Sequence, residues 1–210
     1  MKPYYETELG KLYHGDCLDI LPQLTEKVDA VITDPVWPKH RGMFGDIDAA
    51  QLLADSAALW NCERCVIVMR NDQDPRILTG IPYPFLQVMW LRYAAVGYLG
   101  RFLTGNEAAY AFGKWPSSKP GRHVLPAMGP VQTTPVKNGH PCPRSETHFI
   151  WLVNNWGDGL VLDPFAGSCT TAVAAEKLGR RWIMIELSEQ FCEIGAKRIE
   201  QERSQMKLCL

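Results

Sequence analysis

The chain has 210 residues, of which 46% are hydrophobic and 21% charged, with a formal net charge of −1. This length fits one domain over residues 1–210 with a core of its own, and the balanced charge excludes a wholly basic nucleic-acid binder, although a local basic patch would suffice. No apolar run approaches 18 residues and residues 1–10 lack a signal-peptide core, so we expect no membrane contact.

The cysteines are typical of a reducing compartment. There are seven of them, an odd number, scattered along the chain, which favours free thiols in a cytoplasm over a disulfide framework. Cys62 and Cys65 form a C-x-x-C pair, but no second pair or closely spaced histidines accompany it. We therefore expect no metal.

Strand and helix patterns alternate through the first seventy residues. The run 28–34, VDAVITD, is almost continuously apolar, as in a strand buried on both faces. Further strands are expected at 10–14 and 65–71, and helices at 17–24 and at 47–60, where Asp46 or Asp48 supplies the cap.

The middle of the chain changes character. Two aromatic-rich runs, 85–93 and 108–114, are predicted to pair as outer strands of the sheet. Residues 114–145 are rich in Pro, Gly, Lys and Arg and show little periodicity. We interpret them as a long functional loop or small insertion.

The last third returns to alternation. Helices are predicted at 145–156, 169–179 and 188–203, with Gly179 and Ser188 as caps, and strands at 159–163 and 180–187. The complete pattern predicts an α/β domain with a mostly parallel sheet.

A glycine turn between a strand and a helix, VLDPFAGSCTT at 161–171, predicts a ligand site at the strand ends. Asp163 stands just before the turn, and Glu186 ends the next strand, where an acidic side chain can accept hydrogen bonds from ribose hydroxyls. Gly167 stands alone, without the G-x-G-x-x-G or G-K-[ST] patterns. A nucleoside cofactor without a pyrophosphate fits this turn best.

Four segments resemble the S-adenosylmethionine-dependent DNA amino-methyltransferases, which modify N6 of adenine or N4 of cytosine. They are LYHGDCLDILPQL, TDPVWP, HPCPRSETHFIWLV and LDPFAGSCTTAVAAEKLGRRWIMIEL, in the order of the family's permuted subgroup. The resemblance implies a Rossmann-like class I methyltransferase fold, circularly permuted, with a mostly parallel seven-stranded sheet and helices on both faces. It also implies S-adenosylmethionine as cofactor.

The resemblance assigns cofactor contacts to three parts of the chain. Asp16 would face the adenine of the cofactor, and its alternative role is to cap the following helix. The full set of implied cofactor residues is Asp16, Cys17, Arg144, Ser145, Asp163, Phe165, Ala166, Gly167, Ser168, Cys169, Thr170, Glu186 and Leu187.

The catalytic tetrapeptide implied by the resemblance is Asp34, Pro35, Val36 and Trp37. An exocyclic amino group is a poor nucleophile because its lone pair is delocalised into the ring. The Asp34 carboxylate and the Pro35 carbonyl would each accept one N–H and favour a tetrahedral nitrogen. Trp37 would stack on a base flipped out of the duplex. The alternative is a strand-ending turn with a core tryptophan.

Some residues depart from the family pattern. Val36 replaces a proline, and Arg144 and Ser145 replace Lys and Pro. Cys169 replaces a glycine, so we expect a negative φ there. Met184 also replaces a glycine and is expected to narrow the cofactor pocket.

Recognition of double-stranded DNA is expected from the two segments 114–145 and 39–46, the second resembling a mobile flap, with a solvated loop as the alternative for each. The expected phosphate contacts are Lys39, His40, Arg41, Lys114, Lys119, Arg122, Lys137 and also Arg144, with Trp115 and His123 near bases. So small an element predicts a short or relaxed target, or reliance on a second subunit in a homodimer.

The sequence thus predicts a DNA methyltransferase acting on N6 of adenine, because the family's cytosine enzymes more often carry Ser in place of Asp34. Cytosine N4, RNA, and a degenerate fold that binds without catalysis remain alternatives. Cys142, the candidate nucleophile for a cytosine C5 reaction, lies in the loop matching the H-P-x-x-K-P segment and is interpreted as incidental.

Overall fold

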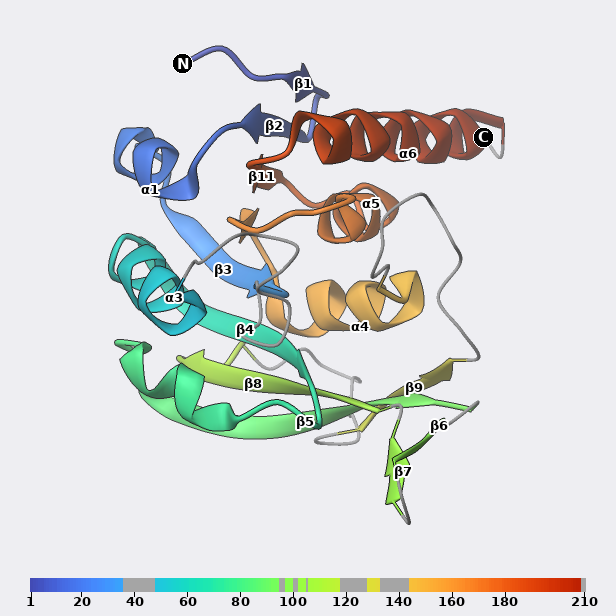
Figure 1. The fold of residues 1–210 in the computed structure, drawn as a ribbon. Coiled ribbons are helices and arrows are strands. Elements are labelled where there is room, and N and C mark those ends of the chain that lie inside the picture. Colours follow the sequence, from blue (N-terminus) through green and yellow to red (C-terminus); the bar gives the residue numbers. More distant parts are fainter. Residues whose placement is uncertain are drawn as a thin grey trace.

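The computed structural model describes residues 1–35, 48–94, 97–99, 102–104, 106–117, 128–132 and 144–208. Its centre is a nine-stranded sheet in the order β1-β2-β11-β10-β3-β4-β8-β5-β9 (Figure 1). The strands are β1 (Tyr5–Glu6), β2 (Gly10–His14), β3 (Val28–Thr33), β4 (Cys62–Arg70), β5 (Phe85–Tyr93), β8 (Glu107–Gly113), β9 (Met128–Gln132), β10 (Val161–Asp163) and β11 (Trp182–Glu186).

Five neighbouring strands, β2, β11, β10, β3 and β4, run parallel. The register pairs Leu162 of β10 with Ile183 of β11 on one side and with Val31 of β3 on the other. All three side chains are buried, as their almost continuous apolar runs predicted. β2, near the start of the chain, lies beside β11, the last strand, which is the permuted arrangement expected from the motif order.

The antiparallel part of the sheet begins at β8, which pairs with β4 and with β5. This confirms the predicted pairing of the two aromatic-rich runs. The sheet is larger than the expected seven strands because the short β1 and the strand β9 add to its two edges. β9 lies inside residues 114–145, so part of that segment is a strand rather than a loop. A small hairpin of β6 (Gly97–Leu99) and β7 (Phe102–Thr104) stands apart from the main sheet.

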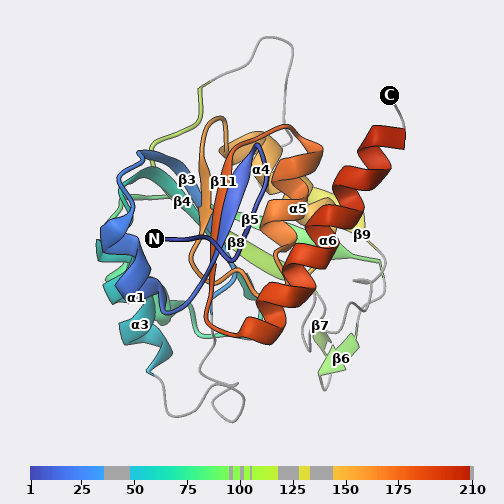
Figure 2. The ribbon, with the colours of Figure 1, turned by 90° about the horizontal axis from the view of Figure 1, so that it is seen from above.

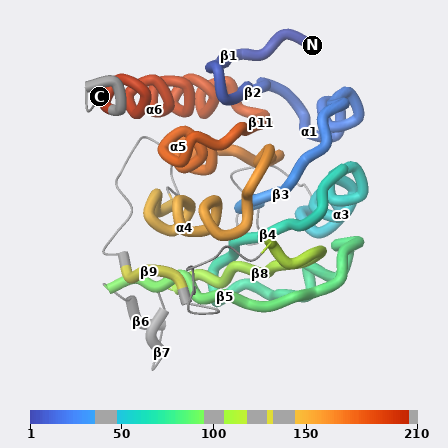
Figure 3. Tube along the Cα trace, turned by 180° about the vertical axis from the view of Figure 1, so that it is seen from behind, coloured from blue at the N-terminus to red at the C-terminus, as the bar shows by residue number. Residues whose placement is uncertain are grey.

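Helices cover both faces of the sheet, as predicted (Figure 2). One face carries α1 (Cys17–Ile20), α3 (Ala49–Ala58) and the 3-10 turns η1 (Leu21–Gln23) and η3 (Pro75–Gly80), which pack into one apolar core. The other face carries α4 (Glu146–Trp156), α5 (Thr170–Lys177) and α6 (Glu189–Leu208), stacked side by side in Figure 3 over a second core. Asp48 caps α3 by accepting hydrogen bonds from the backbone N–H groups of Ala50 and Gln51.

Because the five central strands are parallel, their carboxyl ends meet at one edge of the sheet, which we call the carboxyl edge. β3 ends at Thr33, β10 at Asp163 and β11 at Glu186. Ligands of open α/β sheets bind at this edge. Among the described residues, no helix is long and apolar enough to cross a membrane.

Candidate active site

Asp34 follows β3 directly and stands at the carboxyl edge, where Arg144 meets it. The guanidinium Nη2 donates to Asp34 Oδ1 at 3.0 Å, and Nε donates to Asp34 Oδ2. The side chains keep only 14% and 19% of their surface exposed. A two-pronged pair of this kind fixes the plane of the Asp34 carboxylate.

A second carboxylate shares the same guanidinium. Arg144 Nη1 donates to Glu107 Oε1 at 2.5 Å, and the Tyr93 hydroxyl donates to Glu107 Oε2 at 3.0 Å. Burial raises the pKa of Glu107, against the opposing effect of Arg144. Burial alone would lower the pKa of Arg144, but Asp34 and Glu107 raise it above its ordinary value. We call these four residues, Asp34, Arg144, Glu107 and Tyr93, the clamp network.

The clamp network changes the interpretation of two predicted cofactor residues. Arg144, which was predicted to contact the cofactor, pairs with Asp34, the predicted catalytic carboxylate. Ser145 is 2% exposed at the N-cap of α4, and its hydroxyl has no hydrogen-bond partner within the described part of the chain. Neither Glu107 nor Tyr93 was predicted from the sequence, because each reads as an ordinary strand residue.

The cofactor turn, residues 164–169, follows β10, the strand that pairs with β3 on the side away from β4. Gly167 has φ 52° and Cys169 has φ 59°, so both adopt the left-handed conformation. The expectation of a negative φ at Cys169 is therefore wrong. Among the described residues, Cys169 is the one non-glycine residue with positive φ. The backbone keeps the shape that the family builds with glycine, at a steric cost of about 1–3 kcal/mol.

Room for the Cys169 side chain comes from α6. Gly195 faces it, and a Cβ built on that glycine would lie 2.4 Å from Cys169 Sγ. The thiol is completely buried, and burial raises its pKa well above the ordinary value. Cys169 is thus a packed, neutral core residue.

Glu186 stands beside the turn and receives two backbone hydrogen bonds. Gly167 N–H donates to Oε2 and Ser188 N–H donates to Oε1, each at 2.7 Å. Burial raises the pKa of Glu186 to about 6. Each carboxylate oxygen has a further lone pair, so the residue fits the predicted role of accepting ribose hydroxyls.

Asp163 lies beneath the turn and is 3% exposed. The Thr33 hydroxyl and the Phe165 N–H donate to its Oδ1 at 2.7 and 3.1 Å, and the Thr171 hydroxyl donates to Oδ2 at 2.6 Å. Burial raises its pKa to about 6. These contacts tie β3 and α5 to the turn, so the carboxylate orients the turn from below.

Asp16 is exposed at the end of β2, and Gly15 N–H donates to the Glu186 carbonyl at 2.9 Å, which brings the two acidic residues to neighbouring strand ends. Its carboxylate caps α1 by accepting from Leu18 N–H at 2.8 Å, which confirms the capping interpretation and leaves the cofactor contact compatible with it. Cys17 is buried at the first position of α1, and Leu187 is 61% exposed at the same edge.

The remaining turn residues share one environment. Phe165 is partly exposed, while Ala166, Ser168 and Thr170 are buried at the start of α5. Arg198 of α6 donates to the Ser168 and Thr170 oxygens, a contact that the sequence did not reveal because a basic residue on an amphipathic helix carries no local signal.

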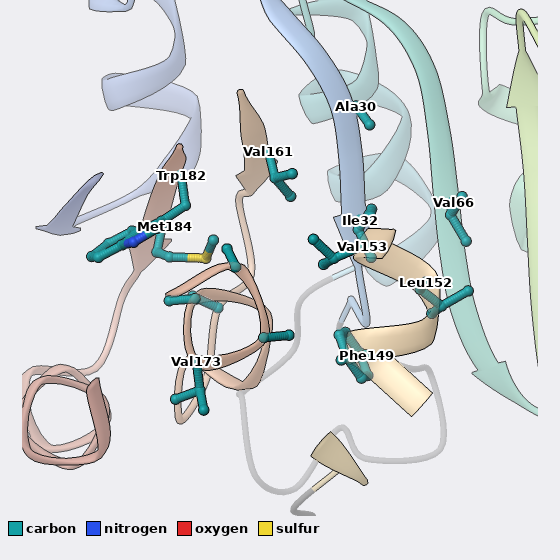
Figure 4. Close-up of a cluster of buried hydrophobic side chains, with 14 of the residues drawn as sticks. Ala30, Ile32, Val66, Phe149, Leu152, Val153, Val161, Val173, Trp182 and Met184 are labelled. Carbon is teal, nitrogen blue, oxygen red and sulfur yellow. The ribbon is translucent and has the colours of Figure 1, made fainter. Parts of the chain in front are cut away.

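Met184 does not narrow a cofactor pocket, contrary to expectation. Its side chain is fully buried in the core between β11 and α5, as Figure 4 shows next to Trp182. Side chains alternate along a strand, so Met184 and Trp182 point to the α5 face. The bulk of the methionine fills the core.

Lys114 and Trp115 follow β8, which runs antiparallel to the central strands, and therefore lie at the opposite edge of the sheet from Asp34. The Lys114 carbonyl accepts from Arg64 Nε near the start of β4, and the Trp115 ring stacks at 5.9 Å from that of Trp156. Pro35 is buried at the end of β3. The other predicted catalytic and DNA-binding residues lie outside the described residues: Val36, Trp37, Lys39, His40, Arg41, Lys119, Arg122, His123 and Lys137.

The chain is similar to known DNA methylases. A family model for N6/N4-type DNA methylases matches residues 131–197. The chain is 25% identical to the type II methyltransferase M.ScaI of Streptomyces caespitosus over 96% of this chain and 84% of that protein. It is 26% identical to M.BamHI of Bacillus amyloliquefaciens over 99% of this chain and 61% of that protein.

Two solved structures share the fold. The M1.HpyAVI–SAM complex superposes with a TM-score of 0.75 at 24% identity, covering 90% of this chain and 99% of that one. The cytosine-N4-specific PvuII DNA methyltransferase gives 0.73 at 18% identity, covering 97% and 93%. The partial family match and these similarities together support an S-adenosylmethionine-dependent DNA amino-methyltransferase.

Proposed function

We propose that this protein methylates the N6 amino group of adenine in double-stranded DNA. The observation that carries the proposal is the adjacency of two strand ends: Asp34 follows β3, and the cofactor turn follows the neighbouring β10. A methyl acceptor held at Asp34 and a nucleoside cofactor held at Glu186 would lie side by side along the carboxyl edge.

The residues at the turn fit S-adenosylmethionine. Glu186 offers lone pairs to ribose hydroxyls, and Asp16 follows the neighbouring strand β2. The single Gly167 and the missing dinucleotide pattern suit a cofactor without a pyrophosphate. When bound, this cofactor supplies an electrophilic methyl group on a sulfonium centre.

Asp34 acts on the amino group as a hydrogen-bond acceptor. Arg144 donates to both carboxylate oxygens and fixes the plane in which Asp34 would accept an N–H of the target base. Asp34 would orient and polarise the nitrogen as a hydrogen-bond acceptor, without taking its proton before the attack. With S-adenosylmethionine held at Glu186, the nitrogen oriented by Asp34 would take the methyl group from the sulfonium sulfur, and the amino proton would leave to solvent.

The choice of adenine rests on Asp34 itself, since the family's cytosine enzymes more often carry Ser at this position. The similar proteins include examples of both specificities. One relative is a DNA adenine methyltransferase from Escherichia coli, and the structural neighbour PvuII is cytosine-N4-specific. Cytosine N4 is therefore the second candidate.

The DNA contacts belong to the same proposal. Val36 and Trp37 would complete the base clamp, and the basic residues of 39–41 together with Lys119, Arg122 and Lys137 would contact phosphates. Lys114 is left out because it lies at the opposite edge. A homodimer that shares DNA contacts fits the short recognition segment. The bacterial relatives support a cytoplasmic location in a prokaryotic or phage-infected cell.

The test is incubation with S-adenosylmethionine and unmethylated DNA, or RNA, followed by nucleoside mass spectrometry. N6-methyladenine in DNA supports the proposal, and N4-methylcytosine or a methylated RNA product redirects it. Cofactor binding without any product would favour a non-catalytic binding protein.

Asp34→Asn should abolish product while leaving calorimetric cofactor binding in place. The matched control is Asp158→Asn, which removes a carboxylate from the turn before β10, at the far edge of the sheet, and should keep activity. Equal activity of Asp34→Asn and wild type would refute the assigned role of Asp34.

A further inference from the structure

The cofactor turn is held from behind by one side chain of α6. Arg198 Nη1 donates to the Ser168 carbonyl at 2.5 Å, to the Ser168 hydroxyl at 3.1 Å and to the Thr170 hydroxyl at 3.1 Å. The arginine side chain is 13% exposed, and Ser168 and Thr170 are buried. Charge-assisted hydrogen bonds are strong, and at this buried position they fix the conformation of the turn.

These bonds surround the strained residue of the turn. Cys169 lies between Ser168 and Thr170 in the left-handed conformation, which disfavours any side chain with a Cβ. Gly195 lies one helical turn before Arg198 on the same face of α6 and leaves space for the thiol. One face of α6 therefore both accommodates Cys169 and ties down its two neighbours.

The same arginine reaches toward the clamp network. Arg198 Nη2 donates to Glu146 Oε1 at 2.9 Å. Glu146 opens α4 and stands two residues after Arg144, which holds Asp34. Lys177 of α5 also pairs with Glu146, at 3.2 Å. A continuous path of hydrogen bonds, ion pairs and two backbone links thus runs from the cofactor turn to the Asp34 carboxylate.

We propose that Arg198 is a positioning residue for the methyl-transfer site. It holds residues 168–170 in the conformation that keeps Gly167 N–H on Glu186, and through Glu146 it sets the cofactor turn relative to the segment that carries Arg144. The proposal rests on the function proposed above, because it takes the turn as the place of the cofactor.

Loss of Arg198 would release the turn because its hydrogen bonds to Ser168 and Thr170 would no longer oppose the strain at Cys169. Arg198→Gln should weaken S-adenosylmethionine binding on the order of tenfold or more, as expected for hydrogen bonds to a charged group. The effect should appear in the cofactor Kd and KM and, to a smaller extent, in kcat, while the KM for DNA stays unchanged. Arg198→Lys keeps the charge but loses the fork, so its cofactor affinity should fall between the two.

The matched control is Arg203→Gln. Arg203 lies on the same helix with 16% of its side chain exposed and pairs with Glu8 and Glu200, away from the turn. Its replacement should leave the cofactor Kd unchanged. Thermal unfolding of each variant checks that the chain is folded at the assay temperature.

A rescue experiment separates positioning from general stability. Cys169→Gly removes the strain that Arg198 opposes, so the loss of affinity caused by Arg198→Gln should shrink in that background. The proposal is overturned if folded Arg198→Gln or Arg198→Lys binds S-adenosylmethionine as tightly as wild type. It is also overturned if Arg198→Gln causes the same loss of cofactor affinity in the Cys169→Gly background as in wild type. A wild-type protein that binds no S-adenosylmethionine would instead refute the proposed function, and this inference with it.

Discussion

Removing the guanidinium of Arg144 tests whether the clamp network stabilises the site. In Arg144→Gln, the Asp34 and Glu107 carboxylates lose their shared cation while only 19% and 6% of their side-chain surfaces are exposed. Taking one partner out of a buried ion pair costs about 3–5 kcal/mol. Since Asp34 retains some contact with solvent, we expect the lower end, about 3 kcal/mol of lost unfolding free energy.

Arg144→Lys separates the positive charge of Arg144 from its hydrogen-bond geometry. A lysine keeps the positive charge but cannot span both Asp34 oxygens and Glu107, so it should lose about 1.5 kcal/mol, the value of one hydrogen bond to a charged group. The control is Arg181→Gln, which breaks the exposed pair with Glu26 and should cost less than about 1 kcal/mol. Urea unfolding measures all three variants.

The loss of unfolding free energy in Arg144→Gln should depend on pH. Burial already raises the pKa of Glu107, and loss of the guanidinium would raise this pKa further in the folded variant. A carboxyl with a raised folded-state pKa gains stability as the pH falls through that pKa toward the unfolded value. The difference in unfolding free energy between wild type and Arg144→Gln should therefore become smaller as the pH falls from 8 to 5. A difference in unfolding free energy that stays constant over this pH range would refute the reasoning. So would a loss for Arg144→Gln that is no larger than the loss for Arg181→Gln.

Three more outcomes are expected. Gly195→Ala should destabilise the protein, because its Cβ would lie 2.4 Å from Cys169 Sγ. In a Cys169→Gly background the same replacement should stabilise the protein by up to about 1 kcal/mol. A Gly195→Ala effect on the unfolding free energy that has the same sign in both backgrounds, measured by urea unfolding, contradicts the packing account. Burial raises the pKa of Glu186 to about 6, so protonation should weaken calorimetric cofactor binding from pH 7 to pH 5, and an affinity flat across this range speaks against ribose binding by that carboxylate. Lys114→Ala should leave DNA affinity and its salt dependence unchanged, and a shallower salt slope would return that residue to the DNA surface.

Local patterns in the sequence determined much of the fold. Apolar runs such as 28–34 and the Gly-containing turn after Asp163 specify buried strands and a strand-turn-helix unit through nearest neighbours alone. Their order along the chain also predicted the permuted sheet, since parallel strands joined by helices have few allowed arrangements. Asp34 and Glu186 could be chosen as site residues because each immediately follows or ends a predicted strand.

Only the tertiary structure decided which distant side chains meet. Arg144 pairs with Asp34 across 110 positions, and Arg198 reaches Ser168 across 30, through contacts that depend on strand order and helix packing. The left-handed Cys169 was mispredicted because its space comes from Gly195 on another helix. Lys114 was expected at the DNA surface, but the antiparallel direction of β8 carries it to the far edge. Periodicity reports what each segment buries, whereas the identity of the partner is set by packing between segments that the local pattern does not encode.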